Sequence, residues 1–180
     1  MTTSASAAYL ALVGTPPKEL RRILLRGEAP DPAKLVGWEY RGTNMPATSR
    51  VMGLRRFIKG FTATAKGIAD GGIEGYNKQV AGADLGSPWT PRPQRDGRVA
   101  FARFAVAPVD PESVDNRFLH ALLFDYGAVA DPEPGIAGHL RDYVVRVVPG
   151  SDDLLLGRAY AALGSVRVAV GWFALERVQV

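Results

Sequence analysis

The spacing of apolar residues along the chain changes once, from a helical period to a strand period. Leu20, Ile23 and Leu24 recur at the three- and four-residue spacing of one helix face. Thr15 precedes them with a hydroxyl that can cap a helix, and two prolines follow it where no backbone donor is needed. The pattern therefore predicts a helix over residues 16–27.

After this helix the apolar residues alternate with polar ones, which is the period of a β-strand. Trp38 and Tyr40 alternate in this way with Glu39 and Arg41. Turn signals separate the alternating segments, and the Asp-Gly-Gly sequence at 70–72 is a strong hairpin signal. The segments that we predict as strands are 36–42, 54–66, 73–80, 98–108, 117–126, 139–148, 154–163 and 166–178.

The connections between these strands predict how they pair. No helix-length pattern separates the later strands, so an antiparallel meander is favoured over a parallel sheet. We predict a mainly β fold, an antiparallel up-and-down β-barrel of about eight to ten strands with an N-terminal helix. Residues 1–15 are expected to form a tail or a short helix, and 16–180 a single calycin-like barrel domain capped by helix 16–27. Such a barrel can hold one small ligand.

The segment 82–98 interrupts the strand pattern, because glycine and proline crowd it. Long loops of this kind in compact domains are often functional or mobile. The loop carries one large aromatic residue, Trp89. Two interpretations stay open: Trp89 closes one end of the barrel as part of a covering flap, or it gates a ligand site.

Composition narrows the functional classes. Hydrophobic residues make up 47% of the 180 residues and charged residues 22%, with a net charge of +4 and no long basic run, which argues against nucleic-acid binding. The absence of cysteine excludes disulfides, thiolate metal sites and cysteine nucleophiles, and it fits a reducing cytosol. No apolar stretch approaches a membrane span, and the N-terminus lacks the basic region of a signal peptide. We therefore predict a cytoplasmic protein.

Polar residues within apolar alternations are the candidates for chemistry. His120 shares its alternation with Phe118 and Leu122, which indicates either a core histidine with satisfied hydrogen bonds or a polar anchor inside a pocket. Two histidines without a carboxylate cluster make a weak zinc site. We expect no metal and no cofactor; a haem held by a single histidine is the alternative.

Charged residues also lie in the alternation of the later strands. If these faces point inward, the charges must pair with one another or with an anionic ligand, because burial of an unpaired charge is costly. If they point outward, the charges face solvent and Tyr143 and Val145 lie inside. A slip of one residue exchanges the two faces, so both registers stay open. The residues concerned are Arg103, Asp142, Arg146, Arg158 and Tyr160.

No motif identifies a catalytic mechanism. The chain contains no nucleophile elbow, no phosphate-binding loop and no dinucleotide-binding fingerprint. Asp125 and Asp142 are one candidate acid–base pair, since paired carboxylates can separate their pKa values and do isomerase or cyclase chemistry. Catalytic residues are otherwise not predicted.

Several short segments resemble the GXWXG-type domain. They are the Gly-Trp-Glu-Tyr-Arg-Gly sequence at 37–42 and the Gly-Leu-Arg-Arg-Phe sequence at 53–57 followed by Lys59. The C-terminal half, including the Trp-Phe-Ala-Leu-Glu-Arg sequence at 172–177, resembles the small domain of unknown function that commonly follows it. The resemblance runs from about residue 20 to 178. Tyr40 departs from it, standing where the motif would have tryptophan, and the loop at 127–138 is longer than the family pattern.

The resemblance implies a lipocalin-like (calycin) barrel that binds a small molecule, with no established catalytic residues. In such barrels a first-strand tryptophan stacks under a last-strand arginine, and here Trp38 and Arg177 are the matching residues. A cation over an indole ring contributes about 0.5–2 kcal/mol. We expect this pair to have a structural role at the barrel end.

Together these features predict a protein that binds a small hydrophobic ligand, in one form a carboxylate-bearing one, inside the barrel. The alternatives are a barrel cyclase or isomerase acting on a polyketide- or lipid-like substrate, and a structural or dimerising module whose barrel is filled by side chains. Whether the chain is an enzyme stays open, as does the oligomeric state, with a homodimer as one alternative. The predicted ligand-binding residues are Trp89, His120, Phe124, Tyr126, Arg146, Arg158 and Tyr160.

Overall fold

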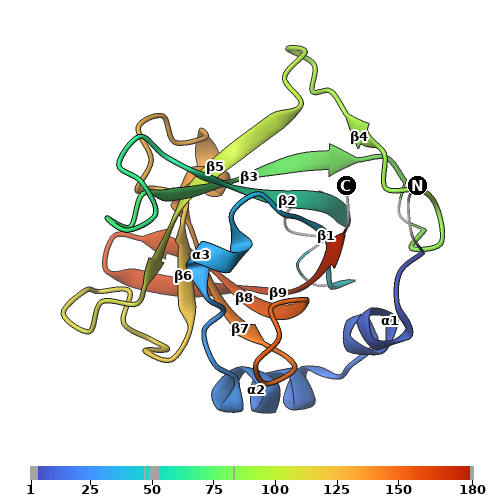
Figure 1. Cartoon of the computed structure of the whole chain (residues 1–180), viewed down its shortest axis with the longest axis horizontal. Helices are drawn as coiled ribbons and strands as arrows, with labels where there is room; N and C mark the ends of the chain where they lie inside the picture. Colours follow the sequence, from blue (N-terminus) through green and yellow to red (C-terminus); the bar gives the residue numbers. More distant parts are fainter. Residues whose placement is uncertain (1–3, 47, 49–52, 83, 179–180) are drawn as a thin grey trace.

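The computed structural model describes residues 4–46, 48, 53–82 and 84–178. Within these ranges the chain forms three α-helices, nine strands and one 3₁₀ helix, η1 (Figure 1). The bounds are α1 Ala7–Val13, α2 Pro17–Arg26, α3 Pro32–Leu35, β1 Glu39–Asn44, β2 Arg56–Ala63, β3 Ile73–Val80, β4 Pro91–Arg92, β5 Ala100–Pro108, β6 Leu122–Asp125, η1 Gly135–His139, β7 Leu140–Arg146, β8 Leu154–Leu163 and β9 Val166–Val178.

Eight of the strands in the described ranges close into an antiparallel barrel (Figure 1). Each barrel strand pairs with its neighbours in chain order, and β4 adds to β3 as an extra strand. Closure comes from β1, where Gly42 lies opposite Phe57 of β2 on one side and Leu175 of β9 on the other. The predicted up-and-down barrel is confirmed, and the first and last strands meet as expected.

Several predicted strand boundaries were wrong, and two of the misplaced strand starts have a clear physical cause. The strand predicted over 117–126 begins only at Leu122, because the chain turns before it and the Ala121 N–H bonds to the Phe118 carbonyl at 2.9 Å. The strand predicted over 139–148 begins at Leu140, because His139 is the last residue of η1. In both places, local hydrogen bonds of a turn or a 3₁₀ helix take the first residues of an apolar alternation out of the strand.

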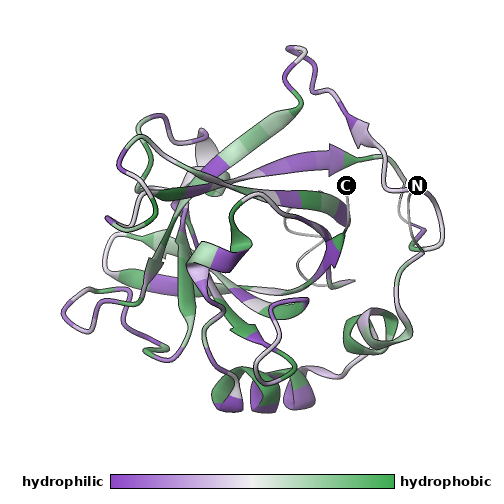
Figure 2. Ribbon diagram, in the orientation of Figure 1, coloured by the Kyte–Doolittle hydropathy of each residue, from purple (hydrophilic) through white to green (hydrophobic). Residues whose placement is uncertain are grey.

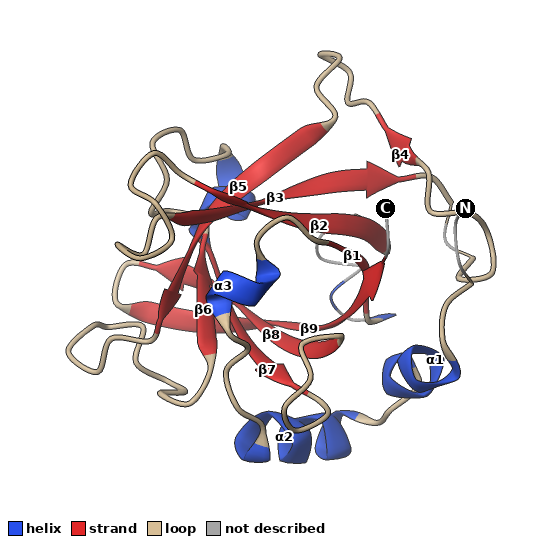
Figure 3. Cartoon of the chain, viewed as in Figure 1, coloured by secondary structure: helices blue, strands red, loops and turns tan. Residues whose placement is uncertain are grey.

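The helices lie around the barrel rather than within its wall (Figure 3). Helix α2 confirms the prediction over 16–27 and buries Leu20 and Leu24 in an outer apolar cluster with Tyr143 and Val145. Its sequence carries both hydrophilic and hydrophobic residues, as expected for a helix with one buried face (Figure 2). In the ranges that the structure describes, no helix is long and apolar enough to cross a membrane.

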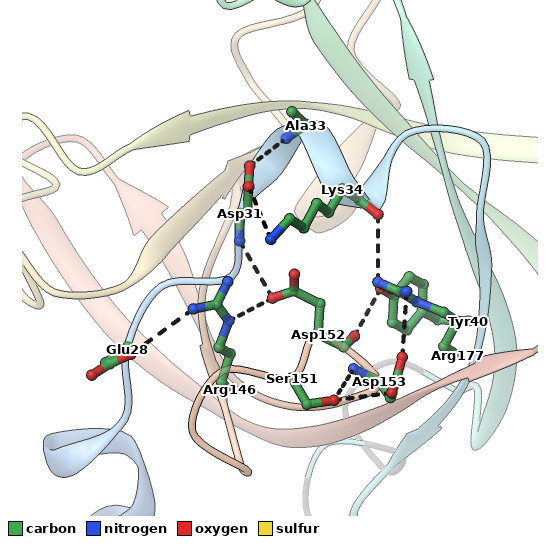
Figure 4. Close-up of polar contacts among 10 residues, drawn as sticks. All are labelled: Glu28, Asp31, Ala33, Lys34, Tyr40, Arg146, Ser151, Asp152, Asp153 and Arg177. Carbon is green, nitrogen blue, oxygen red and sulfur yellow. Dashed lines mark hydrogen bonds and ion pairs between the residues drawn. The ribbon is translucent and has the colours of Figure 1, made fainter.

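Helix α3 lies across one end of the barrel, above a set of polar contacts (Figures 1 and 4). The Tyr40 hydroxyl accepts hydrogen bonds from Arg177 Nε at 3.1 Å and Nη2 at 3.0 Å, and it donates one to the Asp152 carbonyl at 2.9 Å. The Arg177 guanidinium lies 4.8 Å from the centroid of the Trp38 ring, so the expected stacking is confirmed. Leu35, the last residue of α3, is fully buried in the interior core and completes this closed end.

Glycines make room for aromatic rings on neighbouring strands. In three places a phenylalanine ring occupies the space above the glycine directly opposite, where a Cβ atom would be only 2.0–2.2 Å from the nearest ring atom. Such pairs let large rings pack close to the barrel wall. The pairs are Gly42 with Phe57, Gly75 with Phe104, and Gly157 with Phe173.

Replacing Gly157 with valine is expected to lower the free energy of unfolding by about 2 kcal/mol, because the added atoms push the Phe173 ring off its site. Urea denaturation measures the change. Ala107→Val, on an exposed position of β5, is the matched control and should change stability by less than about 0.5 kcal/mol. Equal effects of the two substitutions would show that the ring does not need the space above Gly157.

Candidate functional site

The barrel interior contains a packed apolar core and, beside it, a cavity of about 240 Å³. β1 runs from Glu39, near the closed end, to Asn44 in the cavity wall, so the cavity lies toward the end opposite α3. Its lining is mostly apolar and includes a few polar side chains. The lining residues are Asn44, Thr48, Leu54, Phe57, Lys59, Asn77, Phe101, Ala102, Tyr126, Pro134, Ile136, Ala137, Leu140, Asp142, Ala159 and Phe173.

Four of these residues form a buried polar cluster, which we call the lysine cluster: Lys59, Asn77, Tyr126 and Asp142. Lys59 Nζ donates to Asn77 Oδ1 at 3.0 Å and to the Tyr126 hydroxyl at 2.6 Å. The Tyr126 hydroxyl donates to Asp142 Oδ2 at 3.2 Å, and Lys59 Nζ lies 3.9 Å from the same oxygen. All four residues are at most 6% exposed. The cluster therefore holds a cation and an anion away from bulk water.

Strand register brings the lysine cluster together. Lys59 of β2 lies directly opposite Asn77 of β3. Asp142 of β7 lies directly opposite Phe124 of β6, and Tyr126 follows two residues after Phe124. Residues at this two-residue spacing share one face of a strand, here the barrel interior. The cluster thus joins two separate parts of the barrel wall across its interior.

Aromatic rings surround the Lys59 ammonium group. Its nitrogen lies 4.2 Å from the centroid of the Phe104 ring and 5.1 Å from that of Tyr126. Phe57, Phe124 and Phe173 place their ring centroids 5.5–5.6 Å away. Ring faces attract a cation, but they replace water far less well than hydrogen-bond acceptors do.

Burial shifts the pKa values of Lys59 and Asp142 in the directions that favour their uncharged forms. Loss of hydration lowers the pKa of Lys59 to about 8, although the nearby Asp142 opposes the change. Loss of hydration likewise raises the pKa of Asp142 to about 6, against the opposing effect of Lys59. Burial also raises the pKa of Tyr126 well above its ordinary value, so its hydroxyl stays protonated. The lysine and the aspartate are therefore much closer in pKa than an ordinary pair.

One carboxylate oxygen of the lysine cluster lacks a hydrogen-bond donor among the described residues. Asp142 Oδ1 is buried and has no hydrogen-bond partner among the described residues. A buried carboxylate oxygen without a partner is destabilising, so such an atom in a native structure needs an explanation. Because Asp142 lines the cavity, a bound molecule could supply the missing donor.

The backbone beside the cluster is strained at Ala102. This residue has φ +42°, a conformation that residues other than glycine rarely adopt. Its carbonyl accepts a hydrogen bond from Asn77 Nδ2 at 2.9 Å, and its N–H donates to Glu133 Oε2 at 3.1 Å. The Ala102 carbonyl therefore holds the Asn77 amide in the orientation that presents its oxygen to Lys59, and backbone strain of this kind clusters at functional sites.

The structure does not bring the seven predicted ligand-binding residues together. Tyr126 lines the cavity and Phe124 lies in the interior core. His120 was expected on an inward strand face, but it is exposed in the turn before β6, where its Nε2 lies 2.8 Å from the Leu24 carbonyl oxygen. Arg146 lies at the closed end, where its Nε donates to Asp152 Oδ1 at 2.6 Å (Figure 4).

The three remaining predicted residues lie outside the barrel. Arg158 and Tyr160 are on the outer face of β8, and the Arg158 guanidinium lies 4.5 Å from the centroid of the Trp172 ring. Trp89 is buried outside the barrel in the outer apolar cluster, 4.2 Å from the Arg56 guanidinium. It covers the outside of the barrel wall, so it neither closes a barrel end nor lines the cavity, and neither interpretation of Trp89 matches its position.

The strand registers left open by the sequence differ from one strand to the next. On β7, Leu140, Asp142 and Val144 belong to the interior, while Tyr143 belongs to the outer cluster. On β8 the inward residues include Ala159, so the neighbouring Arg158 faces outward. Asp125 pairs with Arg141 at 2.8 Å, and it alternates with inward-facing neighbours, so it does not meet Asp142. The proposed pairing of these two carboxylates was wrong.

Sequence reasoning missed Lys59 and Asn77 as site residues. The available signal was a lysine between Phe57 and Phe61 at alternate positions, which share one strand face. Long lysine side chains usually reach solvent, which made the position look ordinary. Only the pairing of β2 with β3, together with the position of β7, shows that this lysine points into the barrel.

Comparisons with protein-family models, curated proteins and solved structures gave no match. The resemblance to the GXWXG-type domain therefore stays a prediction. Among the residues that the structure describes, no group of three or more histidine, aspartate or glutamate side chains could hold a metal ion.

Proposed function

We propose that this protein binds a small, largely apolar molecule inside its barrel, with the polar end of the molecule against the lysine cluster. The single observation that carries the proposal is Asp142 Oδ1, a buried acceptor in the wall of a cavity for which the described residues supply no hydrogen-bond donor. Ligand sites typically combine an apolar lining with a few converging polar groups, and this cavity has both. The resemblance to lipocalin-like barrels agrees with the proposal.

A neutral ligand fits the cavity better than a carboxylate. The described hydrogen bonds direct Lys59 toward Asn77 and Tyr126, and Asp142 already provides a negative charge beside it. A ligand carboxylate would add a second anion to a poorly hydrated site. The arginines that were expected to bind it, Arg146 and Arg158, do not line the cavity. We therefore propose a hydroxyl or another neutral polar group at the bound end.

Calorimetric titration with two matched probes tests the proposal. 2-Naphthol and 2-naphthoic acid share one ring system, but only naphthol is neutral at pH 7. We expect 2-naphthol to bind about tenfold more tightly or better, which corresponds to about 1.4 kcal/mol. Ala159→Phe should abolish the binding, because the new ring fills space at a residue of the cavity wall.

Ala107→Phe is the matched control, because position 107 lies on β5 but is exposed. This variant should bind 2-naphthol as the native protein does. Unchanged binding in Ala159→Phe would place the probe elsewhere and contradict the proposal. Preferential binding of 2-naphthoic acid would support a ligand in the cavity but contradict the proposed neutral polar group at its bound end.

The compartment and the partner class belong to the same proposal. The absence of cysteine fits a reducing cytoplasm. The small net charge of +4 fits a small-molecule partner better than a nucleic acid. We propose the cytoplasm as the location and a small hydrophobic molecule as the partner.

A further inference from the structure

We infer that Lys59 captures the carbonyl group of a small aldehyde or ketone as a covalent imine inside the barrel. This inference rests on the proposed ligand cavity and specifies the chemistry of its ligand. It follows from three features of the lysine cluster: the buried amine at the cavity wall, the hydroxyl that joins it to Asp142, and the carboxylate oxygen without a partner.

The surroundings of the Lys59 amine favour its action as a nucleophile. Lys59 Nζ lies in the cavity wall, its side chain is 1% exposed, and five aromatic rings surround it. A lysine becomes a nucleophile when its surroundings disfavour the ammonium form, as a hydrophobic pocket does. The pKa of Lys59, which burial lowers to about 8, agrees with this placement, because it raises the share of uncharged amine near neutral pH.

The cluster also contains a route for the proton that the amine must lose. The Tyr126 hydroxyl lies 2.6 Å from Lys59 Nζ and 3.2 Å from Asp142 Oδ2, so it connects the two groups directly. A proton from the ammonium group can move onto the tyrosine oxygen while the tyrosine proton moves to the carboxylate. The result is a neutral amine beside a neutral carboxyl group.

The groups of the lysine cluster can supply and accept every proton that imine formation requires. Lys59 Nζ attacks the carbonyl carbon, the carbon–oxygen π bond breaks, and the oxygen takes the proton held by Asp142, giving a carbinolamine. The nitrogen loses one proton through Tyr126, the oxygen gains a second one and leaves as water, and a carbon–nitrogen double bond forms. One water molecule is released, and no oxidant or reductant is required.

The oxygen without a partner fits the intermediate. The carbinolamine carries a hydroxyl group on the carbon bonded to Lys59 Nζ, and that nitrogen lies 3.9 Å from Asp142 Oδ2. That hydroxyl can donate a hydrogen bond to Asp142 Oδ1, the acceptor that the described residues leave unused. Once Asp142 has received the nitrogen's proton through Tyr126, the same carboxyl group can donate it to this hydroxyl, which then leaves as water.

Reductive trapping with 2-naphthaldehyde tests the inference. The protein is incubated with the aldehyde and cyanoborohydride, which converts an imine to a stable amine, and the modified lysine is located by peptide mass mapping. We expect one adduct, on Lys59, to form at least about tenfold faster than on any other lysine. Lys59→Met should lose this adduct, and Lys66→Met, at an exposed turn, should keep it.

Tyr126→Phe separates the chemistry from the cavity. Compared at equal occupancy of the cavity, as measured by competition with 2-naphthol, this variant should form the Lys59 adduct at least about tenfold more slowly than the native protein, because the proton route is broken. If 2-naphthaldehyde competes with 2-naphthol in the native protein but gives no Lys59 adduct, the imine is excluded and the cavity proposal stands. If the adducts spread evenly over all lysines, the imine is excluded as well. If neither probe binds, both proposals fail.

Discussion

Replacement of Lys59 with methionine is expected to lower the free energy of unfolding by about 3 kcal/mol at pH 7, because Asp142 then stays buried without its cation. The loss should disappear at pH 4. The folded-state pKa of Asp142 is raised to about 6, so the folded protein carries this group protonated at pH 4 and no longer needs the cation. Urea denaturation of both proteins at the two pH values measures the difference.

The sign of this pH dependence follows from proton binding. Between pH 4 and 6 the folded protein binds more protons at Asp142 than the unfolded chain does, so this group lowers stability as the pH rises. Without Lys59 the pKa of Asp142 rises further, because the lysine was lowering it, and the destabilisation continues to higher pH. An equal loss at pH 4 and pH 7 would contradict a buried charge pair.

Two further variants complete the experiment. Lys66→Met removes an exposed lysine and should leave stability within about 0.5 kcal/mol of native. The double variant Lys59→Met with Asp142→Leu removes both buried charges and should be at least as stable as the native protein at pH 7. Loss of 2-naphthol binding in this stable double variant would show that the pair serves the ligand rather than the fold.

Arg56→Met is expected to lower the free energy of unfolding by about 3 kcal/mol. The Arg56 side chain is fully buried and donates to the carbonyls of Ala81, Ser87 and Pro88 at 3.1, 2.7 and 2.9 Å. Its guanidinium also lies 4.2 Å from the centroid of the Trp89 ring. Methionine can fill part of the volume, but it leaves these three carbonyls without their charged donor.

Urea denaturation measures the loss, and limited proteolysis shows whether the segment after β3 opens. The neighbouring Arg55 is exposed, so Arg55→Met is the matched control and should have little effect on either measurement. A similar small effect in Arg56→Met would show that the loop is held by apolar contacts of Trp89 alone.

The barrel could be predicted from the sequence because strand period and turn chemistry are local. Alternating residues such as Trp38 and Tyr40, and turn signals such as 70–72, identify strands and hairpins without knowledge of the rest of the chain. The start of β6 was not predictable in this way. Phe118 and His120 continue the apolar alternation, but turn hydrogen bonds take them out of the strand.

The candidate site depends on long-range pairing, so the sequence showed only part of it. Tyr126 was found because it continues an apolar strand face. Asp142 was recognised within an apolar alternation and Lys59 was missed, because which strand face points inward depends on the register of the whole barrel. Arg158 illustrates the same limit, since its strand turns the arginine face outward and Ala159 inward.

The most direct test of the ligand proposal is a crystal structure of the protein with 2-naphthol. The proposal predicts the naphthol ring within the barrel, among the rings of Phe57, Phe101 and Phe173, and its hydroxyl within hydrogen-bond distance of Asp142 Oδ1. An empty or collapsed cavity, or a probe bound only on the outer surface, would contradict it.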